Sequence, residues 1–120
     1  MIIENYINGE VVVVNLGSVE RGEIKGHEQA KKRPCVVIKE FSKRGLLIIV
    51  PFTTTQPKSN TPYYVTKILP TENNGLTEEC NALCNQIRTV SVERVETKLG
   101  ILDDIDFKKI QATLLDTLEL

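Results

Sequence analysis

Few side chains in this sequence are suited to acid–base or metal chemistry. His27 is the only histidine among the 120 residues. It can titrate near neutral pH and assist proton transfer, although a solvated loop histidine is an equally good interpretation. The three cysteines, Cys35, Cys80 and Cys84, are an odd number, and Cys35 lies in an apolar run. We therefore expect free, mostly buried thiols; a four-ligand zinc site would consume every Cys and His in the chain.

The acidic residues do not suggest a metal site either. Asp103, Asp104 and Asp106 are clustered, but they lie at the start of a predicted helix. Carboxylates are favoured there because they cap the helix and complement its dipole. We therefore predict no metal and no other cofactor.

Arg33 and Thr53 are suited to binding an anion. The planar guanidinium of an arginine matches two phosphate oxygens at once, and Pro34 biases Arg33 towards an extended conformation. Taken alone, Arg33 fits a surface salt bridge at the start of a strand. Thr53 lies where an apolar run gives way to a polar loop, so its hydroxyl can be presented from a rigid strand, although threonine is common at strand ends.

The elements that position these residues are mostly short β-strands. Apolar, β-branched runs predict strands over 9–16, 34–40, 46–52 and 63–69, and weaker alternation predicts two short strands within 79–90. Four consecutive valines within 9–16 favour a strand buried on both faces. Polar loops are expected over 17–33 and 53–62, a turn over 70–75, and a turn or one helical turn over 91–94.

A C-terminal helix is predicted from Asp103 to about Leu118. Its apolar residues recur at helical spacing and form one stripe: Phe107, Ile110, Leu114, Leu115 and Leu118. Many short strands followed by one helix predict a mainly β protein, a small antiparallel barrel with a C-terminal helix. The length predicts a single domain, residues 1–120.

Charge is distributed unevenly, although the formal net charge is only −1. Residues 21–33 carry five cationic groups against two glutamates, whereas residues 101–120 carry two lysines against five acidic groups. This balance argues against a protein that coats DNA nonspecifically and allows a local cationic site. No apolar run is long enough to cross a bilayer, and the N-terminus lacks the features of a signal peptide. We therefore expect a cytoplasmic protein with no membrane contact.

Four stretches, in order, resemble one known family. Residues 26–34 (GHEQAKKRP) are similar to a G-S-E-Q-x-x-x-R-P motif, and residues 50–54 (VPFTT) to a strand end that carries an active-site threonine. Residues 85–90 (NQIRTV) are similar to E-Q-I-R-T-I, and residues 9–17 to a G-D-V-x-x-V-D-L start. Together they resemble the MazF/PemK family of toxin endoribonucleases.

The resemblance implies a small SH3-like or CcdB-like barrel and metal-independent, sequence-selective cleavage of single-stranded RNA. The products would be a 2′,3′-cyclic phosphate and a 5′-hydroxyl. Arg33 would contact the scissile phosphate and Thr53 would donate a hydrogen bond to it, so both must converge on one anion pocket. Further substrate contacts are expected from His27, Glu28, Gln29, Lys31, Lys32, Thr54, Thr55 and Gln86. We expect Gln86 and Arg88 on the same face of one strand. The resemblance also implies a homodimer that a separate antitoxin protein neutralises.

The sequence departs from the family pattern at the rim of this site. His27 stands in place of a serine, Asn85 in place of a glutamate, and the Lys31–Lys32 pair makes the loop more basic. The alternative is a non-cleaving module of the same barrel, such as a CcdB-like toxin that inhibits DNA gyrase, or an inactive family member. Arg33 and Thr53 in the nuclease positions favour the ribonuclease.

Overall fold

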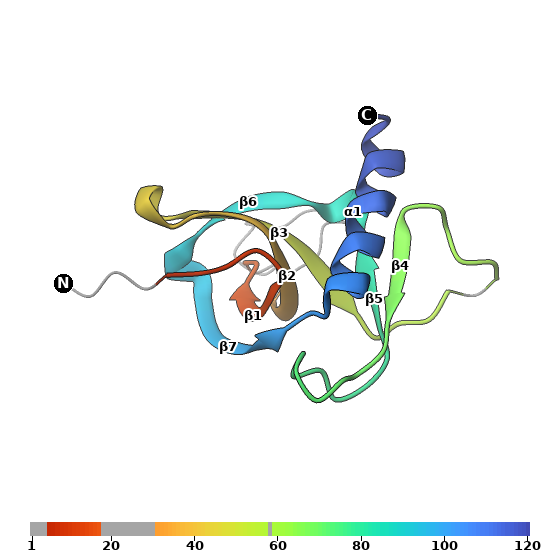
Figure 1. Ribbon diagram of the computed structural model, residues 1–120, viewed down its shortest axis with the longest axis horizontal. Helices are drawn as coiled ribbons and strands as arrows, with labels where there is room; N and C mark the ends of the chain where they lie inside the picture. Colours follow the sequence, from red (N-terminus) through yellow and green to blue (C-terminus); the bar gives the residue numbers. More distant parts are fainter. Residues whose placement is uncertain (1–4, 18–30, 58) are drawn as a thin grey trace.

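The computed structural model describes residues 5–17, 31–57 and 59–120, which form seven β-strands and one α-helix (Figure 1). The elements are β1 (Glu10–Asn15), β2 (Lys32–Phe41), β3 (Leu46–Thr53), β4 (Val65–Ile68), β5 (Cys80–Leu83), β6 (Arg88–Ser91), β7 (Val95–Ile101) and α1 (Asp104–Leu118). Three short 3₁₀ turns connect strands: η1 (Ser42–Arg44), η2 (Cys84–Gln86) and η3 (Val92–Arg94).

The strands form one antiparallel sheet in the order β4-β5-β3-β2-β1-β7. β3 is the central element, because it pairs with β2 along one edge and with two strands along the other. Residues 46–49 of β3 pair with β6, and Phe52 and Thr53 pair with β5. β6 leads through η3 into β7, so the sheet curls into a barrel-like shape that no ladder closes among the described strands. The predicted fold class, a mainly β protein with a C-terminal helix, is confirmed.

Both faces of the central strands are buried, as the run of valines predicted. Val11 belongs to one apolar cluster, with Phe52 and Ile110, whereas Val12 and Val14 belong to a second cluster inside the curled sheet. Successive side chains of a strand point to opposite faces, so a strand between two cores needs consecutive apolar residues. Residue Val13 is partly exposed.

Helix α1 packs against the outer face of the sheet, near β4 and η2 (Figure 1). Ile110 and Leu114 are buried against it, and the hydroxyl of Thr66 on β4 donates a hydrogen bond to Thr113 Oγ1 at 2.6 Å. The predicted apolar stripe is buried only in part, since Leu115 and Leu118 are 52% and 46% exposed. The stripe is wider than the sheet surface that the helix contacts.

The capping prediction at the start of α1 was only half right. Asp103 occupies the N-cap position, but its side chain makes no capping hydrogen bond. Asp104 and Asp106 lie in the first turn, where carboxylates complement the helix dipole.

Other differences from the predicted elements occur at exposed edges. β7 (Val95–Ile101) was not predicted, because its residues are mostly exposed and its pairing with β1 shifts register twice. β4 is shorter than the predicted strand over 63–69. Most of the predicted loop over 17–33 lies outside the described residues, but its ends are joined: Lys31 N donates to Gly17 O at 2.8 Å and Leu16 N donates to Lys31 O at 2.9 Å.

Candidate active site

The strand register brings Arg33 and Thr53 together. In the β2–β3 ladder Cys35 pairs with Pro51, and continuing that antiparallel register by two residues places Arg33 opposite Thr53. In the β3–β5 ladder Thr53 pairs with Asn81. Directly opposed residues point to the same face and have Cβ atoms about 4.5–5.5 Å apart. Arg33, Thr53 and Asn81 therefore form one row across three strands, on the face of the sheet opposite α1.

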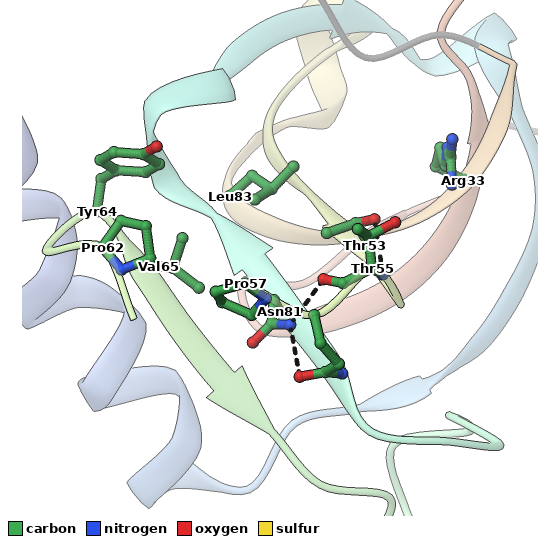
Figure 2. Close-up of a pocket in the computed structure, with 10 residues that line it drawn as sticks. Arg33, Thr53, Thr55, Pro57, Pro62, Tyr64, Val65, Asn81 and Leu83 are labelled. Atoms are coloured by element: carbon green, nitrogen blue, oxygen red, sulfur yellow. Dashed lines mark hydrogen bonds between the residues drawn. The ribbon is translucent and has the colours of Figure 1, made fainter. Parts of the chain in front are cut away.

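This row forms part of the wall of an open pocket of about 340 Å³ (Figure 2). The lining residues are Arg33, Thr53, Thr55, Gln56, Pro57, Pro62, Tyr64, Val65, Asn81 and Leu83. In Figure 2, Arg33 lies at one end of the pocket and Tyr64 at the other, with Thr53 and Leu83 between them. Arg33 and Thr53 thus line the same pocket, and their predicted contacts with an anion stay predictions.

The segment after β3 is folded back and tied to β5. Thr55 N donates to Thr53 Oγ1 at 3.2 Å, which makes the threonine hydroxyl an acceptor in a local turn. Asn81 Nδ2 donates to Thr55 O at 3.1 Å. A hydroxyl that accepts one hydrogen bond can still donate another, so Thr53 Oγ1 can also donate to a ligand in the pocket.

The pocket has a positive end and a neutral remainder. Arg33 is the one charged residue among the ten that line it, and no carboxylate is among them. The Arg33 side chain is half-buried, so water screens its charge less than at an open surface. The lining combines one guanidinium, three hydroxyl-bearing residues (Thr53, Thr55 and Tyr64) and several apolar side chains. This combination suits an anionic ligand that also carries a weakly polar group.

Only some of the other predicted site residues line the pocket. Thr55 lines the pocket; Lys31, Lys32 and Thr54 are exposed and are not among the lining residues. Lys32 Nζ lies 3.6 Å from Glu96 Oε1 in an exposed ion pair. His27, Glu28 and Gln29 lie outside the described residues, so their predicted roles stay predictions.

The prediction that Gln86 and Arg88 share one strand face was wrong. Gln86 ends the 3₁₀ turn η2, whereas Arg88 begins β6, with Ile87 between them outside any strand. A 3₁₀ turn breaks the two-residue periodicity on which the prediction depended. Arg88 Nη1 donates to Leu16 O at 3.4 Å, so its guanidinium makes a contact within the fold. Gln86 is not among the residues that line the pocket.

Sequence reasoning missed much of the pocket wall, notably Asn81 and Tyr64. Asn81 is 1% exposed within β5, and its neighbours Cys80 and Ala82 are buried and apolar. A lone amide inside a short apolar strand was a signal, since buried polar groups need partners. Pro57 and Pro62 come from the predicted loop over 53–62, where the sequence gives no indication of which side chains face inward. Tyr64 lies at the start of the predicted strand over 63–69, before the observed strand β4 begins.

The thiols are free and buried, as predicted. Burial raises the pKa of Cys35 to about 12, and burial likewise raises the pKa of Cys84 to about 11. Both groups are therefore neutral thiols near pH 7 and poor nucleophiles. None of the three cysteines lines the pocket, so the described part of the site offers arginine, hydroxyl and amide groups rather than a thiolate.

Comparison with known proteins identifies the family. Residues 7–118 match the family described as the PemK-like, MazF-like toxin of type II toxin–antitoxin systems. The chain belongs to this toxin family. The resemblance that the sequence motifs indicated is thereby confirmed. No curated protein sequence matches the chain.

Solved structures of MazF toxins share the fold. MazF (Form-I) from Deinococcus radiodurans is 20% identical with a TM-score of 0.72, over 97% of this chain and 100% of that one. An endoribonuclease in complex with its cognate antitoxin, from a mycobacterial species, is 18% identical with a TM-score of 0.70, over 97% of both chains. The Mycobacterium tuberculosis toxin MazF-mt6 is 15% identical with a TM-score of 0.67, over 92% of this chain and 97% of that one. At these identities the comparison establishes the shared fold.

Among the described residues, no helix is both long and apolar enough to cross a bilayer.

Proposed function

We propose that this MazF-like toxin is an endoribonuclease that cleaves single-stranded RNA at selected sequences without a metal ion. The observation that supports this most strongly is the placement of Arg33 and Thr53, from two different strands, in the wall of one pocket. Family membership supports the same activity.

The proposed reaction is an internal transesterification. The 2′-oxygen of one nucleotide attacks the adjacent phosphorus and loses its proton, while the bond from phosphorus to the 5′-oxygen breaks and that oxygen gains a proton. The products are a 2′,3′-cyclic phosphate and a 5′-hydroxyl. Negative charge accumulates on the non-bridging oxygens in the transition state, and fixed donors there lower the barrier.

Arg33 and Thr53 supply those donors. The guanidinium fork of Arg33 contacts two phosphate oxygens, and the Thr53 hydroxyl donates a third hydrogen bond. An arginine side chain stays protonated at neutral pH, so its role in this proposal is charge stabilisation. His27 remains the candidate for proton transfer, and Lys31 and Lys32 would attract the RNA backbone over a longer range.

The direct test incubates the purified protein with single-stranded RNA in EDTA. We expect discrete fragments with cyclic-phosphate ends, and a loss of about 10²–10³-fold or more in rate for Arg33→Ala. Arg33→Lys should stay impaired, because an ammonium lacks the planar fork. The control is Arg44→Ala, which removes an exposed arginine in η1, outside the pocket. Cleavage that requires a metal ion, or that survives Arg33→Ala unchanged, would contradict the proposal.

The partners in this proposal are an antitoxin protein and a second copy of the chain. One of the similar structures is an endoribonuclease with its cognate antitoxin, and we propose that an acidic antitoxin segment covers the cationic end of the pocket here. Light scattering should show a homodimer, and the antitoxin should protect RNA from cleavage. A monomer, or an antitoxin complex that cleaves at the full rate, would contradict this part.

The non-cleaving alternative has a different outcome in the same experiment. Intact RNA together with inhibited DNA supercoiling would indicate a gyrase-binding toxin, and inactivity in both assays would indicate a family member that has lost its activity.

A further inference from the structure

Asn81 has an unsatisfied acceptor at the pocket wall. The residue is 1% exposed, and Nδ2 donates to Thr55 O at 3.1 Å and to Gln56 Oε1 at 3.4 Å. Asn81 Oδ1 is buried and has no hydrogen-bond partner among the residues that the structure describes. A buried acceptor without a partner loses its hydration and gains nothing in return, so Oδ1 is a candidate acceptor for a ligand's hydrogen bond.

The orientation of this amide follows from its neighbours. The Thr55 carbonyl oxygen only accepts hydrogen bonds, so the Asn81 atom facing it must be the nitrogen. Rotating the amide by half a turn would put two oxygens in contact and leave Nδ2 without an acceptor. Oδ1 is therefore the atom that faces away from the Thr55–Gln56 backbone (Figure 2).

The pocket wall beside Asn81 is mostly apolar. Pro57, Pro62, Tyr64, Val65 and Leu83 line it. Tyr64 supplies an aromatic face, and Val65 and Leu83 are paired across β4 and β5. Unstacked bases bind to proteins through aromatic and apolar faces together with hydrogen bonds at their edges. Thr53 and Asn81 are paired across β3 and β5, so this part of the pocket begins next to the proposed phosphate contact.

We propose that this part of the pocket binds a nucleobase beside the scissile phosphate, and that Asn81 Oδ1 accepts a hydrogen bond from an exocyclic amino group of that base. This inference rests on the proposed ribonuclease function. Adenine, cytosine and guanine each carry such an amino group, guanine at C2 on another edge of its ring, and uracil carries none. Asn81 then determines specificity for amino bases at one position of the RNA.

The choice of an amino group follows from the recessed position of the acceptor. The ring N–H of uracil lies between two carbonyl groups, which flank it and keep it from entering a recess. An exocyclic amino group projects from the ring and can reach a recessed acceptor such as Asn81 Oδ1. Oδ1 is buried, so side chains beside Asn81 must move for the base to reach it. Gln56 is exposed and held to Asn81 by a long bond of 3.4 Å.

The first experiment uses the wild-type protein and RNA analogues. Ends of fragments from a mixed RNA pool define the two bases that flank the scissile phosphate. At one of them we expect a base with an exocyclic amino group to be preferred over uracil. Replacing that amino group by hydrogen, with purine riboside for adenosine, pyrimidin-2-one riboside for cytidine or inosine for guanosine, should lower kcat/KM about 10-fold, the effect of one lost hydrogen bond to a buried partner.

The second experiment repeats the series with Asn81→Leu, which has a similar shape and no amide. The preference for the amino group should fall below about 2-fold, because the discriminating acceptor is gone. The matched control is Gln56→Leu, which removes the other side of the 3.4 Å bond and should retain the preference. If the analogues and the parent bases are cleaved equally by the wild type, the inference is wrong whether or not Asn81→Leu folds.

The outcomes separate this inference from the proposed function. RNA cleavage without an amino-base preference, or a preference that Asn81→Leu retains, overturns the role of Asn81 and leaves the ribonuclease proposal standing. Failure of the wild type to cleave any RNA overturns both.

Discussion

Replacing Thr53 by valine tests the hydroxyl and little else. Valine keeps the β-branched shape at the end of β3, and the backbone pairing of Thr53 with Asn81 on β5 is unaffected. The change removes one hydrogen-bond donor to the phosphate and the acceptor for Thr55 N at 3.2 Å. The two losses have different consequences, so activity and stability should separate.

The expected loss of activity is large. A single preorganised donor to a developing oxyanion contributes about 3–4 kcal/mol, which corresponds to 10²–10³ in rate. The expected loss of stability is small, below about 1 kcal/mol, because Thr55 is exposed and water can replace the lost acceptor. The assay is single-turnover cleavage of end-labelled RNA in EDTA, with urea unfolding of the same variant measured in parallel.

Two further variants complete this test. Thr53→Ser keeps the hydroxyl and should retain activity within about 10-fold, since only a methyl group is lost. Thr97→Val makes the same chemical change at an exposed position of β7, outside the pocket, and should leave the rate unchanged. If Thr53→Val cleaves within about 3-fold of the wild type, the hydroxyl does not contact the reacting phosphate and the donor argument is refuted.

Three predictions concern the rest of the fold. Phe52→Ala should cost about 3–5 kcal/mol in urea unfolding, because Phe52 is 1% exposed in the core between the sheet and α1; a cost below 1 kcal/mol would contradict the packing. Gly100→Ala should destabilise by more than about 2 kcal/mol, since its Cβ would lie 2.2 Å from the Asn73 carbonyl oxygen; a neutral effect in thermal unfolding would refute that close approach. Burial holds the pKa of Cys35 at about 12 against an ordinary 9.0, so the unfolded chain loses this proton first. The stability from a neutral Cys35 is therefore complete below pH 9 and falls towards pH 12, and Cys35→Ala should show a shallower alkaline decline in the free energy of unfolding.

A strand or helix could be predicted from the sequence where its hydrophobic pattern lies within the segment itself. The buried strands over 10–15 and 46–53 and the terminal helix follow from β-branched runs and a helical stripe, which each segment contains in full. β7 escaped prediction because its pattern is that of an exposed, irregular edge strand. Its place in the sheet comes from pairing with β1, a contact that no local pattern encodes.

The site residues likewise divide into those found from local motifs and those placed only by strand pairing. Arg33 and Thr53 were found through short motifs, but Asn81 enters the row only through the β3–β5 register. Gln86 was misplaced because a 3₁₀ turn interrupts the strand that its motif suggested. Residues that belong to a short motif could therefore be predicted from the sequence. The other residues of the pocket wall could not, because their position depends on the pairing register between distant segments.

The two faces of the sheet have consequences for how cleavage would be inhibited. Phe52 and Ala82 face α1 in the outer core, while their neighbours Thr53 and Asn81 face the pocket. A partner that covers only the exposed side of α1 leaves the pocket open to RNA. It would stop cleavage only by shifting β3, and β3 is held by β2 along one edge and by β5 and β6 along the other. Because packed cores resist small displacements, an antitoxin that inhibits this protein is expected to bind over the pocket itself and to compete directly with RNA.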